Sequence, residues 1–243
     1  MSGPNTAIVT GASGGIGRAI AEAMLEAGHH VVSLDRRKPD WSHAKLEPVL
    51  VDLFDPKATA DAAKDVAARH AVSHVVHNAG IIRPNLIEQV TAEDIAALSQ
   101  LHLGAALTLV QAALPGMKER HFGRVILIAS RAALGAATRT AYSATKSGMF
   151  GMARTWALEL ATDGITVNVV APGPIADTEM FRSIVPQDSE REKALAAAIP
   201  VKRLGQSDDV ARAVMFFCDR ANGFVTGQTL YICGGASLGT IVI

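Results

Sequence analysis

The stretch Thr10-Gly11-Ala12-Ser13-Gly14-Gly15-Ile16-Gly17 decides the fold. A short apolar run precedes it at residues 7–10, and Ile16, Ile20 and Met24 follow with helical spacing. Glycines let backbone N–H groups approach a pyrophosphate closely, and the first turn of a helix attracts negative charge. The stretch lacks the Lys-Ser/Thr ending of a triphosphate-binding loop. It therefore predicts a dinucleotide site, and the alternative is a tight strand-to-helix turn without a ligand.

Short apolar runs alternate with longer helical windows along the rest of the chain. Strands that are apolar on both faces and separated by helices indicate a parallel sheet covered on both sides. We expect one α/β domain over residues 1–243, a Rossmann-like doubly wound sheet of about seven strands. The expected strands are 7–10, 30–35, 48–53, 74–77, 124–129, 166–171 and 229–232, and later helices are expected at 57–69, 91–117, 140–161 and 207–218.

One segment fits this alternation poorly. Residues 177–204 contain helix-forming residues interrupted by Pro186 and Pro200. A long excursion of this kind in a compact domain is often a lid or binding loop. We expect residues 177–204 to form a substrate-binding lid.

Composition excludes several classes of protein. Among 243 residues, Lys+Arg and Asp+Glu are balanced at 23 each, so no basic face for nucleic acid is indicated. The two cysteines predict free thiols in a reducing compartment. Neither a cleavable leader nor a window of ~18 unbroken apolar residues is found. These features predict a cytoplasmic protein that does not span a membrane.

The end of the second expected strand bears on the cofactor. Asp35 lies eighteen residues after Gly17, where a dinucleotide fold places the acid that binds the adenosine ribose. A carboxylate there would repel a 2′-phosphate and favours NAD. Arg36 and Arg37 favour NADP instead, because an arginine accommodates that phosphate. Since the glycine stretch itself holds no basic residue, NAD is the expected cofactor and NADP the alternative.

A tyrosine and a lysine carry the candidate chemistry. Tyr142 and Lys146 lie four residues apart, so they share one face of the expected helix. A free tyrosine has a pKa near 10, and lowering it by about three units takes roughly 4 kcal/mol. A nearby ammonium group supplies such a field. The pair predicts a general acid/base, and the alternative is a surface contact.

Taken in order along the chain, these residues resemble the short-chain dehydrogenase/reductase family, over almost the whole length. The resemblance implies hydride transfer between a nicotinamide cofactor and a secondary alcohol or ketone. By the same resemblance Tyr142 is the acid/base, Lys146 also holds the nicotinamide ribose, and Ser130 hydrogen-bonds the substrate oxygen. The motifs that carry it are the glycine stretch, Asn78-Ala79-Gly80, Ser130, Tyr142-Ser-Ala-Thr-Lys146, Asn168, Pro172-Gly173, Gly227-Gln228 and Gly234-Gly235.

The resemblance also implies where the cofactor lies. It places Asp52 near the adenine, Ile16 near the nicotinamide, and Ile175 with Thr178 over the carboxamide. The segment after Pro172-Gly173 is one residue longer than in the family, so Asp177 is the alternative to Thr178. The expected cofactor-binding residues are Gly11, Ser13, Gly15, Ile16, Gly17, Asp35, Arg36, Asp52, Leu53, Asn78, Ala79, Gly80, Tyr142, Lys146, Pro172, Gly173, Ile175 and Thr178.

Three positions depart from the family pattern. His102 falls where the family has an asparagine that supports a water chain to the lysine. A histidine donates and accepts hydrogen bonds and titrates near neutral pH, so His102 is a candidate catalytic residue. The alternative is a buried structural histidine. His77 replaces another asparagine, and Cys233 replaces an aspartate.

No metal site is expected. His70, His74 and His77 are close in sequence, but His74 and His77 are an odd number of residues apart on a strand and face opposite sides. No acidic or cysteine partner completes a ligand set.

The expected substrate loops are mostly apolar. They comprise residues 81–84, 134–140 and 180–186, and they favour an aryl, alicyclic or acyl secondary alcohol over a bare sugar. Arg83 or Arg139 offers a charge for a substrate anion, although loop arginines are commonly solvated. Two other functions are considered: an NADPH-dependent 3-oxoacyl reductase and a non-catalytic dinucleotide sensor. A sensor would be expected to have lost Tyr142 or Lys146.

Two helical windows are nearly free of charge. Residues 95–117 carry none apart from His102, and residues 142–161 carry only Lys146, Arg154 and Glu159. A helix that is apolar all round must be covered on more than one side. We expect a homotetramer joined through these two helices, with the apolar residues 239–243 forming a buried tail.

Overall fold

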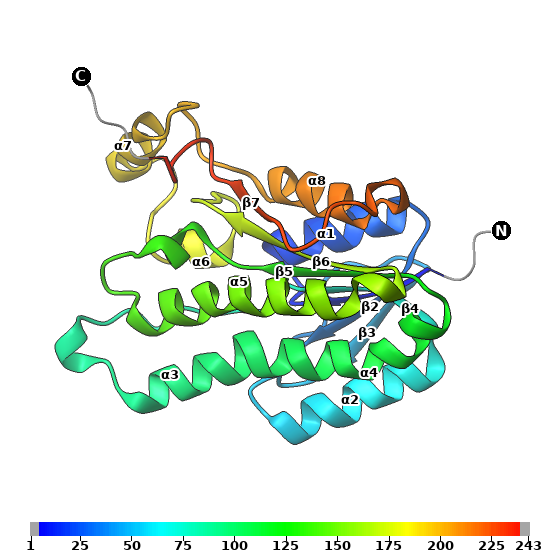
Figure 1. Cartoon of the computed structure of the whole chain (residues 1–243). Helices are drawn as coiled ribbons and strands as arrows, with labels where there is room; N and C mark the ends of the chain where they lie inside the picture. The colour runs from blue at the N-terminus through cyan, green and yellow to red at the C-terminus, as the bar shows by residue number, and fades with distance from the viewer. Residues whose placement is uncertain (1–4, 239–243) are drawn as a thin grey trace.

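A computed structural model describes residues 5–238 and shows one parallel sheet of seven strands between two layers of helices (Figure 1). The strand order is β3-β2-β1-β4-β5-β6-β7, which is the expected doubly wound arrangement. The strands are β1 Thr6–Thr10, β2 His30–Asp35, β3 Leu46–Leu50, β4 Val72–His77, β5 Gly123–Ile128, β6 Ile165–Pro172 and β7 Thr229–Ile232. The helices are α1 Gly15–Glu26, α2 Pro56–Arg69, α3 Ala92–Ser99, α4 Ala105–Glu119, α5 Thr140–Leu160, α6 Glu179–Arg182, α7 Glu190–Ala198 and α8 Ser207–Cys218.

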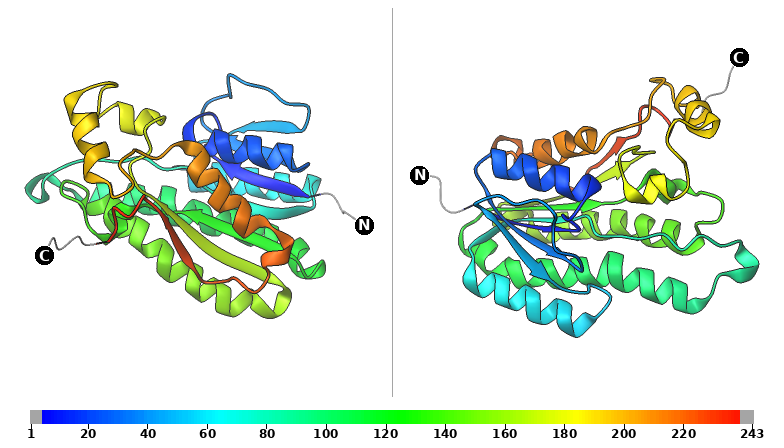
Figure 2. Two further views of the ribbon diagram at one scale, coloured as in Figure 1. Left: turned by 90° about the horizontal axis from the view of Figure 1, so that it is seen from above. Right: turned by 180° about the vertical axis from the view of Figure 1, so that it is seen from behind.

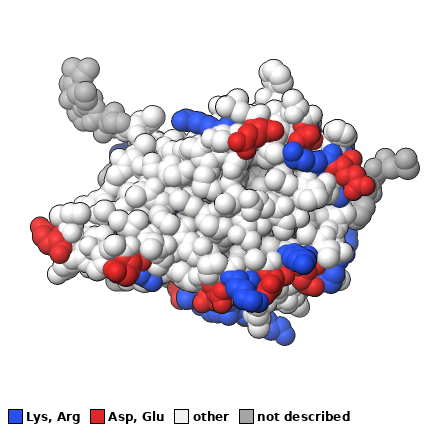
Figure 3. Space-filling view, turned by 60° about the horizontal axis from the view of Figure 1, so that its bottom comes forward, with Lys and Arg blue, Asp and Glu red and all other residues white. Residues whose placement is uncertain are grey.

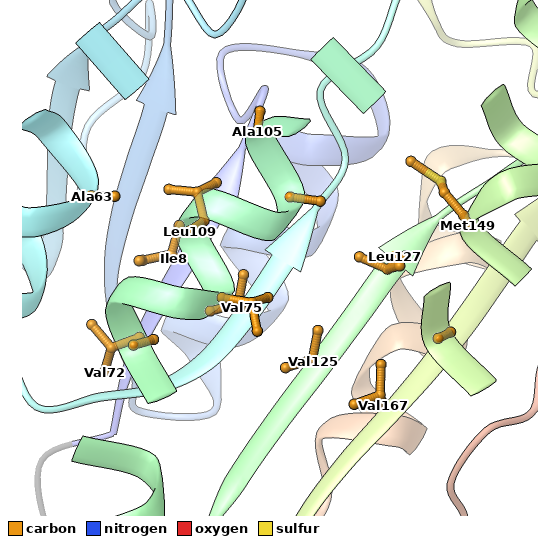
Figure 4. Packing of buried hydrophobic residues seen from close by; sticks show 14 of the residues in the cluster. Ile8, Ala63, Val72, Val75, Ala105, Leu109, Val125, Leu127, Met149 and Val167 are labelled. Carbon is orange, nitrogen blue, oxygen red and sulfur yellow. The ribbon is translucent and has the colours of Figure 1, made fainter. Parts of the chain in front are cut away.

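Each face of the sheet has its own apolar core. Helices α1 and α8 cover one face, and α2, α4 and α5 cover the other. Successive residues of a strand point to opposite faces, so Ile8 joins the core under α2, α4 and α5 while Val9 joins the core under α1 and α8. Figure 4 shows the first of these cores, with Leu109 and Met149 packed against strand residues. This two-sided burial explains why the strands read as continuous apolar runs.

The third strand lies earlier in the chain than residues 48–53, so that expectation is wrong at both ends. Within residues 5–238, β3 lies at the edge of the sheet and pairs with β2 alone, with Pro48 opposite Ser33. An edge position tolerates proline, because one side of the strand needs no ladder hydrogen bonds. After Leu50 the chain turns toward α2, where the Asp55 carboxylate accepts hydrogen bonds from the first-turn N–H groups and Pro56 begins the helix.

The helix expected over residues 91–117 is divided. α3 begins with a capping box between Thr91 and Asp94, a π-helical turn spans residues 100–104, and α4 continues from there. A π-helical turn adds one residue to the helix locally and is common at functional sites. Here it contains His102, whose side chain is fully buried.

The excursion at residues 177–204 forms two short helices, α6 and α7, beyond the carboxyl ends of the strands (Figure 2). A small cluster of Ala176, Ile199 and Leu204 with Phe181 and Leu195 holds it together. The expected buried tail at residues 239–243 lies outside the described residues. Taken together, α3, the π-helical turn and α4 form a helical stretch, Ala92–Glu119, that is long and apolar enough to cross a membrane by length and composition alone. Its α4 part packs on α2, β4 and β5, as a core helix of a globular domain does.

Candidate active site

The expected site residues gather at the carboxyl ends of the central strands. The glycine turn follows β1, Asp35 ends β2, Asn78 follows β4 and Ser130 follows β5. In an open parallel sheet this edge, where the strand order reverses between β1 and β4, is the usual ligand crevice.

The glycine turn has the shape that a pyrophosphate requires. Gly11 and Gly15 have positive φ angles of 71° and 52°, which suit glycine, and a Cβ at Gly17 would overlap the Gly11 carbonyl oxygen. Gly14 has nothing within 4 Å of its Cβ position, and no side chain caps the first turn of α1. Open space at Gly14 and a first turn without a side-chain cap fit an anionic group of a dinucleotide.

A buried polar network fixes this turn to the neighbouring strand. The Thr10 hydroxyl accepts hydrogen bonds from the Asn78 and Ala79 N–H groups, both at 2.9 Å. It therefore donates to His77 Nδ1 at 3.2 Å, and His77 Nε2 donates to the Leu101 carbonyl at 3.0 Å. Burial lowers the pKa of His77 to about 3, so the ring stays neutral. His77 thus links the glycine turn to the π-helical turn.

Asp35 faces the glycine turn. Its carboxylate accepts hydrogen bonds from the Ser13 and Arg37 N–H groups, each at 3.1 Å. Arg36 is exposed, whereas the Arg37 guanidinium pairs with Glu179 of α6 at 3.0 Å. Sequence reasoning missed Trp41, whose Nε1 donates to the Ala12 carbonyl at 3.2 Å, because no periodic pattern marks its loop.

The other expected cofactor residues differ in placement. Asp52 is exposed near the end of β3, but Leu53 is buried in the core under α2 and α4. Thr178 lies against Gly15, 3.3 Å from its Cβ position, whereas Asp177 binds the backbone N–H and hydroxyl of Ser207. This geometry favours Thr178 over Asp177 as a cofactor contact. The remaining members of the set are Ile16 in α1, Gly80 after β4, Pro172 at the end of β6, and Gly173 and Ile175 after that strand.

Ser130, Tyr142 and Lys146 meet at the same edge of the sheet. The Tyr142 side chain is buried, and burial raises its pKa, opposed by a hydrogen bond from Ser130 and by the positive charge of Arg139. Lys146 Nζ donates to the Ile128 carbonyl at 2.6 Å and lies 5.8 Å from the centre of the Tyr142 ring. Burial lowers the pKa of Lys146 to about 7. The pKa of Tyr142 is therefore raised here, where a lowering was expected, and sequence reasoning missed the contribution of Arg139.

His102 lies behind the pair. Thr145 donates its hydroxyl proton to the Ala141 carbonyl, so it accepts from His102 Nδ1 at 2.8 Å. His102 Nε2 is then an acceptor, and within residues 5–238 it is buried without a partner. Nε2 lies 2.9 Å and Lys146 Nζ 3.3 Å from the Cβ position of Gly80. Burial depresses the pKa of His102 far below neutral, so the expectation that it titrates near neutral pH is wrong.

The histidines rejected as metal ligands behave as expected on their strand. His74 Nε2 points to the Cys218 carbonyl under α8, and His77 points to the opposite face. His70 instead meets His30 and Glu47, whose ligating atoms lie within 4.8 Å of one another, so the expectation that no acidic partner stands near these histidines is wrong for His70.

A cation already contacts this cluster. The Arg69 guanidinium donates to Glu47 at 2.6 Å and lies 3.1 Å from His70 Nε2, so we assign no metal to it.

Comparison with known proteins identifies the family. A family model described as enoyl-(acyl carrier protein) reductase matches residues 11–237. Subunit BbsD of a hydroxy(phenyl)methylsuccinyl-CoA dehydrogenase of Thauera aromatica is 36% identical, with 96% of each chain covered. The 3-oxoacyl-acyl-carrier-protein reductase FabG of Escherichia coli is 33% identical, over 94% of this chain and 96% of its own.

Solved structures agree with this fold and family. A protein of Beutenbergia cavernae, described as an NAD(P)-dependent gluconate 5-dehydrogenase with NADP at low occupancy, superposes with a TM-score of 0.85 at 34% identity, covering 95% of this chain and 96% of its own. The ligand-free aldohexose dehydrogenase of Thermoplasma acidophilum gives a TM-score of 0.90 at 28% identity, covering 99% and 96%. The chain belongs to the short-chain dehydrogenase/reductase family of oxidoreductases.

Proposed function

We propose that this protein transfers a hydride between NAD(H) and a secondary alcohol or ketone, with Tyr142 as the general acid/base. The observation that carries the proposal is the meeting of Ser130, Tyr142 and Lys146 at the edge of the sheet that also carries the uncapped first turn of α1. Such a constellation next to a dinucleotide-binding turn suits proton transfer coupled to hydride transfer.

The chain's own residues manage the proton. In the oxidative direction the Tyr142 phenolate takes the hydroxyl proton of the alcohol, and the hydrogen on the same carbon leaves as hydride. The nicotinamide, when bound, supplies the hydride acceptor. Ser130 hydrogen-bonds the substrate oxygen and so orients it toward Tyr142. Lys146, fixed by the Ile128 carbonyl, holds the ribose and stabilises the phenolate in its charged form.

The cofactor preference is the finer part of the proposal. Relatives of this chain include an NADP-bound structure, and Asp35 is the residue that opposes that choice here. Its carboxylate already accepts two backbone hydrogen bonds, so its position beside the glycine turn is fixed. We expect kcat/KM for NAD to exceed that for NADP at least tenfold, with Asp35→Ala narrowing the gap. A wild-type preference for NADP would contradict this.

We further propose that His102 positions Lys146 through a bridging water. Its Nε2 acceptor lies beside the Lys146 ammonium and lacks a partner in the described chain. Replacing His102 with Leu should reduce kcat and change the pH–rate profile of the enzyme, while His102→Asn should keep most of both. Full activity with an unchanged profile in the leucine variant would assign His102 a purely structural part.

A second candidate is the reduction of 3-oxoacyl thioesters with NADPH. It is favoured by relatives that carry that name at 33% identity. A non-catalytic dinucleotide sensor is disfavoured, since Tyr142 and Lys146 are both present and adjacent. We also propose that the protein is cytoplasmic and assembles as a homotetramer through α4 and α5.

One experiment separates these functions. Absorbance at 340 nm is followed with NAD or NADP and a panel of secondary alcohols, and with NADPH and acetoacetyl thioesters. Turnover of an alcohol with NAD supports the first candidate, and turnover confined to NADPH and the thioester supports the second. Cofactor binding without turnover of any compound would favour the sensor.

A further inference from the structure

Arg83 and Arg139 are the two candidates for binding a substrate anion, and the structure distinguishes them. Arg83 Nη1 pairs with the Asp94 carboxylate at 3.0 Å, and its guanidinium lies 6.0 Å from the centre of the Phe54 ring. Asp94 also closes the capping box of α3 with Thr91. Arg83 therefore already has an anionic partner and a structural part.

Arg139 has a different environment. Its Nη1 donates to the hydroxyl of Thr138 at 2.6 Å and to the carbonyl of the same residue at 3.3 Å. Both acceptors are uncharged, and these are its only side-chain hydrogen bonds within residues 5–238. A guanidinium has five N–H donors, so most of them remain available. Because the side chain is half-buried, a positive charge is held at the site without a carboxylate of the described chain to balance it.

The backbone around Arg139 is tied down. Thr138 has a φ of 64°, a left-handed conformation that is uncommon for a residue with a side chain. The Asn85 N–H donates to the Thr138 carbonyl at 3.0 Å, which joins the loop after β4 to the loop before α5. The Ser143 N–H donates to the Arg139 carbonyl at 2.7 Å, so α5 continues directly from this position. The backbone that carries Arg139, three residues before Tyr142, is thus held in place by hydrogen bonds.

The positive charge of Arg139 acts on the Tyr142 phenol, and the side chains around this phenol are apolar. The positive charge of Arg139 lowers the pKa of the Tyr142 phenol against the effect of burial. The side chains packed with Tyr142 are Leu98, Ala141, Ile81, Ile82 and Ala132. The surroundings of Tyr142 therefore combine apolar side chains with one cationic group.

We propose that Arg139 binds a carboxylate of the substrate, and that the substrates are hydroxy acids or oxo acids with an apolar remainder. The carboxylate lies close to the reacting carbon, because Arg139 and Tyr142 stand on the same turn at the start of α5. A guanidinium is suited to this task, since its fork matches the two oxygens of a carboxylate. The inference rests on the proposed hydride transfer and specifies its substrate class.

The test compares matched substrates. NAD reduction at 340 nm is measured with 2- and 3-hydroxy acids, their methyl esters and their coenzyme A thioesters, for wild type, Arg139→Gln, Arg139→Lys and Arg83→Gln. We expect wild type to prefer the acids over the esters in kcat/KM. Arg139→Gln should reduce kcat/KM about 10- to 100-fold more for the acids than for the esters, mainly through a higher KM for the acids. Arg139→Lys should recover part of the loss, and Arg83→Gln should keep the wild-type ratio.

The ratio of kcat/KM for an acid to kcat/KM for its ester isolates the interaction between Arg139 and the carboxylate. Removing Arg139 also takes a charge away from Tyr142, but that effect acts equally on both substrates and cancels. An equal loss for acid and ester, or a wild-type preference for esters, would overturn the proposal. So would turnover confined to the thioesters, whose anionic groups are phosphates.

A binding measurement separates this proposal from the proposed function. The fluorescence of enzyme-bound NADH is titrated with the unreactive carboxylate 3-phenylpropanoate. Binding that Arg139→Gln weakens, in the absence of turnover of any alcohol, would retain the carboxylate site and refute the hydride transfer. Turnover of alcohols without binding of the carboxylate would retain the hydride transfer and refute the carboxylate site.

Discussion

At Lys146, catalysis and stability make opposite demands. The ammonium is buried, and its pKa falls from the ordinary 10.5 to about 7. Between these two values the unfolded chain binds more protons than the folded one, so folding stability rises with pH across this window. At pH 7 and below, the buried charge costs up to roughly 5 kcal/mol, at ~1.36 kcal/mol per pH unit.

Lys146→Met should therefore abolish turnover and raise the melting temperature at pH 7. Each kcal/mol is worth roughly 2–4 °C in a chain of this size, and the gain should shrink as the pH approaches 10.5. Thermal unfolding followed by circular dichroism at pH 6, 7, 8 and 9 measures this. A methionine variant that melts below wild type at pH 7 would show that the hydrogen bond to the Ile128 carbonyl outweighs the burial of the charge.

Single residues could be identified from the sequence where a motif marks them, but their electrostatics could not. Ser130, Tyr142 and Lys146 stand at the recognised spacing and meet in space. The pKa of each buried group depends on neighbours distant in sequence, which no spacing reveals. His102 is an example. Its sequence position predicts a ring that titrates near neutral pH, but burial lowers its pKa and keeps the ring uncharged.

At the scale of elements, the strand β1, the glycine turn and α1 form one unit. Gly17 is buried, and a Cβ there would overlap the Gly11 carbonyl oxygen, so any side chain must displace the turn. Gly17→Ala should lower the melting temperature and weaken NADH binding at least tenfold. Gly14→Ala is the matched control for stability, because nothing lies within 4 Å of its Cβ position. Equal melting temperatures for the two variants would argue against this account of the turn.

The boundaries of an element were predicted correctly where the local sequence pattern constrains them strongly. β2 and β7 begin and end where the apolar runs do, at His30–Asp35 and Thr229–Ile232. β3 was misplaced because the apolar residues 51–53 continue the pattern while the chain leaves the sheet for α2. The π-helical turn at residues 100–104 leaves hydrophobic periodicity nearly unchanged over so short a stretch, so it could not be predicted.

At the scale of the whole molecule, one face is largely without charge. Figure 3 shows a broad surface free of Lys, Arg, Asp and Glu on the side of α4 and α5. On these helices Leu107 is 40% and Leu158 is 84% exposed. Large exposed apolar patches are unusual on soluble monomers, and a two-fold axis would make such a face self-complementary. This surface supports the proposed assembly.

Leu158→Arg should disrupt assembly without disturbing the core, because its side chain is outside it. Light scattering should give wild type a mass near four times 25.4 kDa and the variant a smaller one. Leu50→Arg is the control, since Leu50 is 63% exposed on the edge strand β3, and it should leave the mass unchanged. A wild-type mass near 25.4 kDa would refute the tetramer.

The central claim about the site is that the Tyr142 phenol transfers the proton of the reaction. Tyr142→Phe removes the hydroxyl but keeps the ring that packs with Leu98 and Ala141. Loss of a positioned acid/base typically costs ~10²–10⁴-fold in rate. The decisive measurement is the rate of NAD reduction at 340 nm for wild type and Tyr142→Phe, beside the affinity of each for NADH. We predict that kcat falls at least a hundredfold while NADH affinity changes little; comparable kcat values in the two proteins would contradict the assignment.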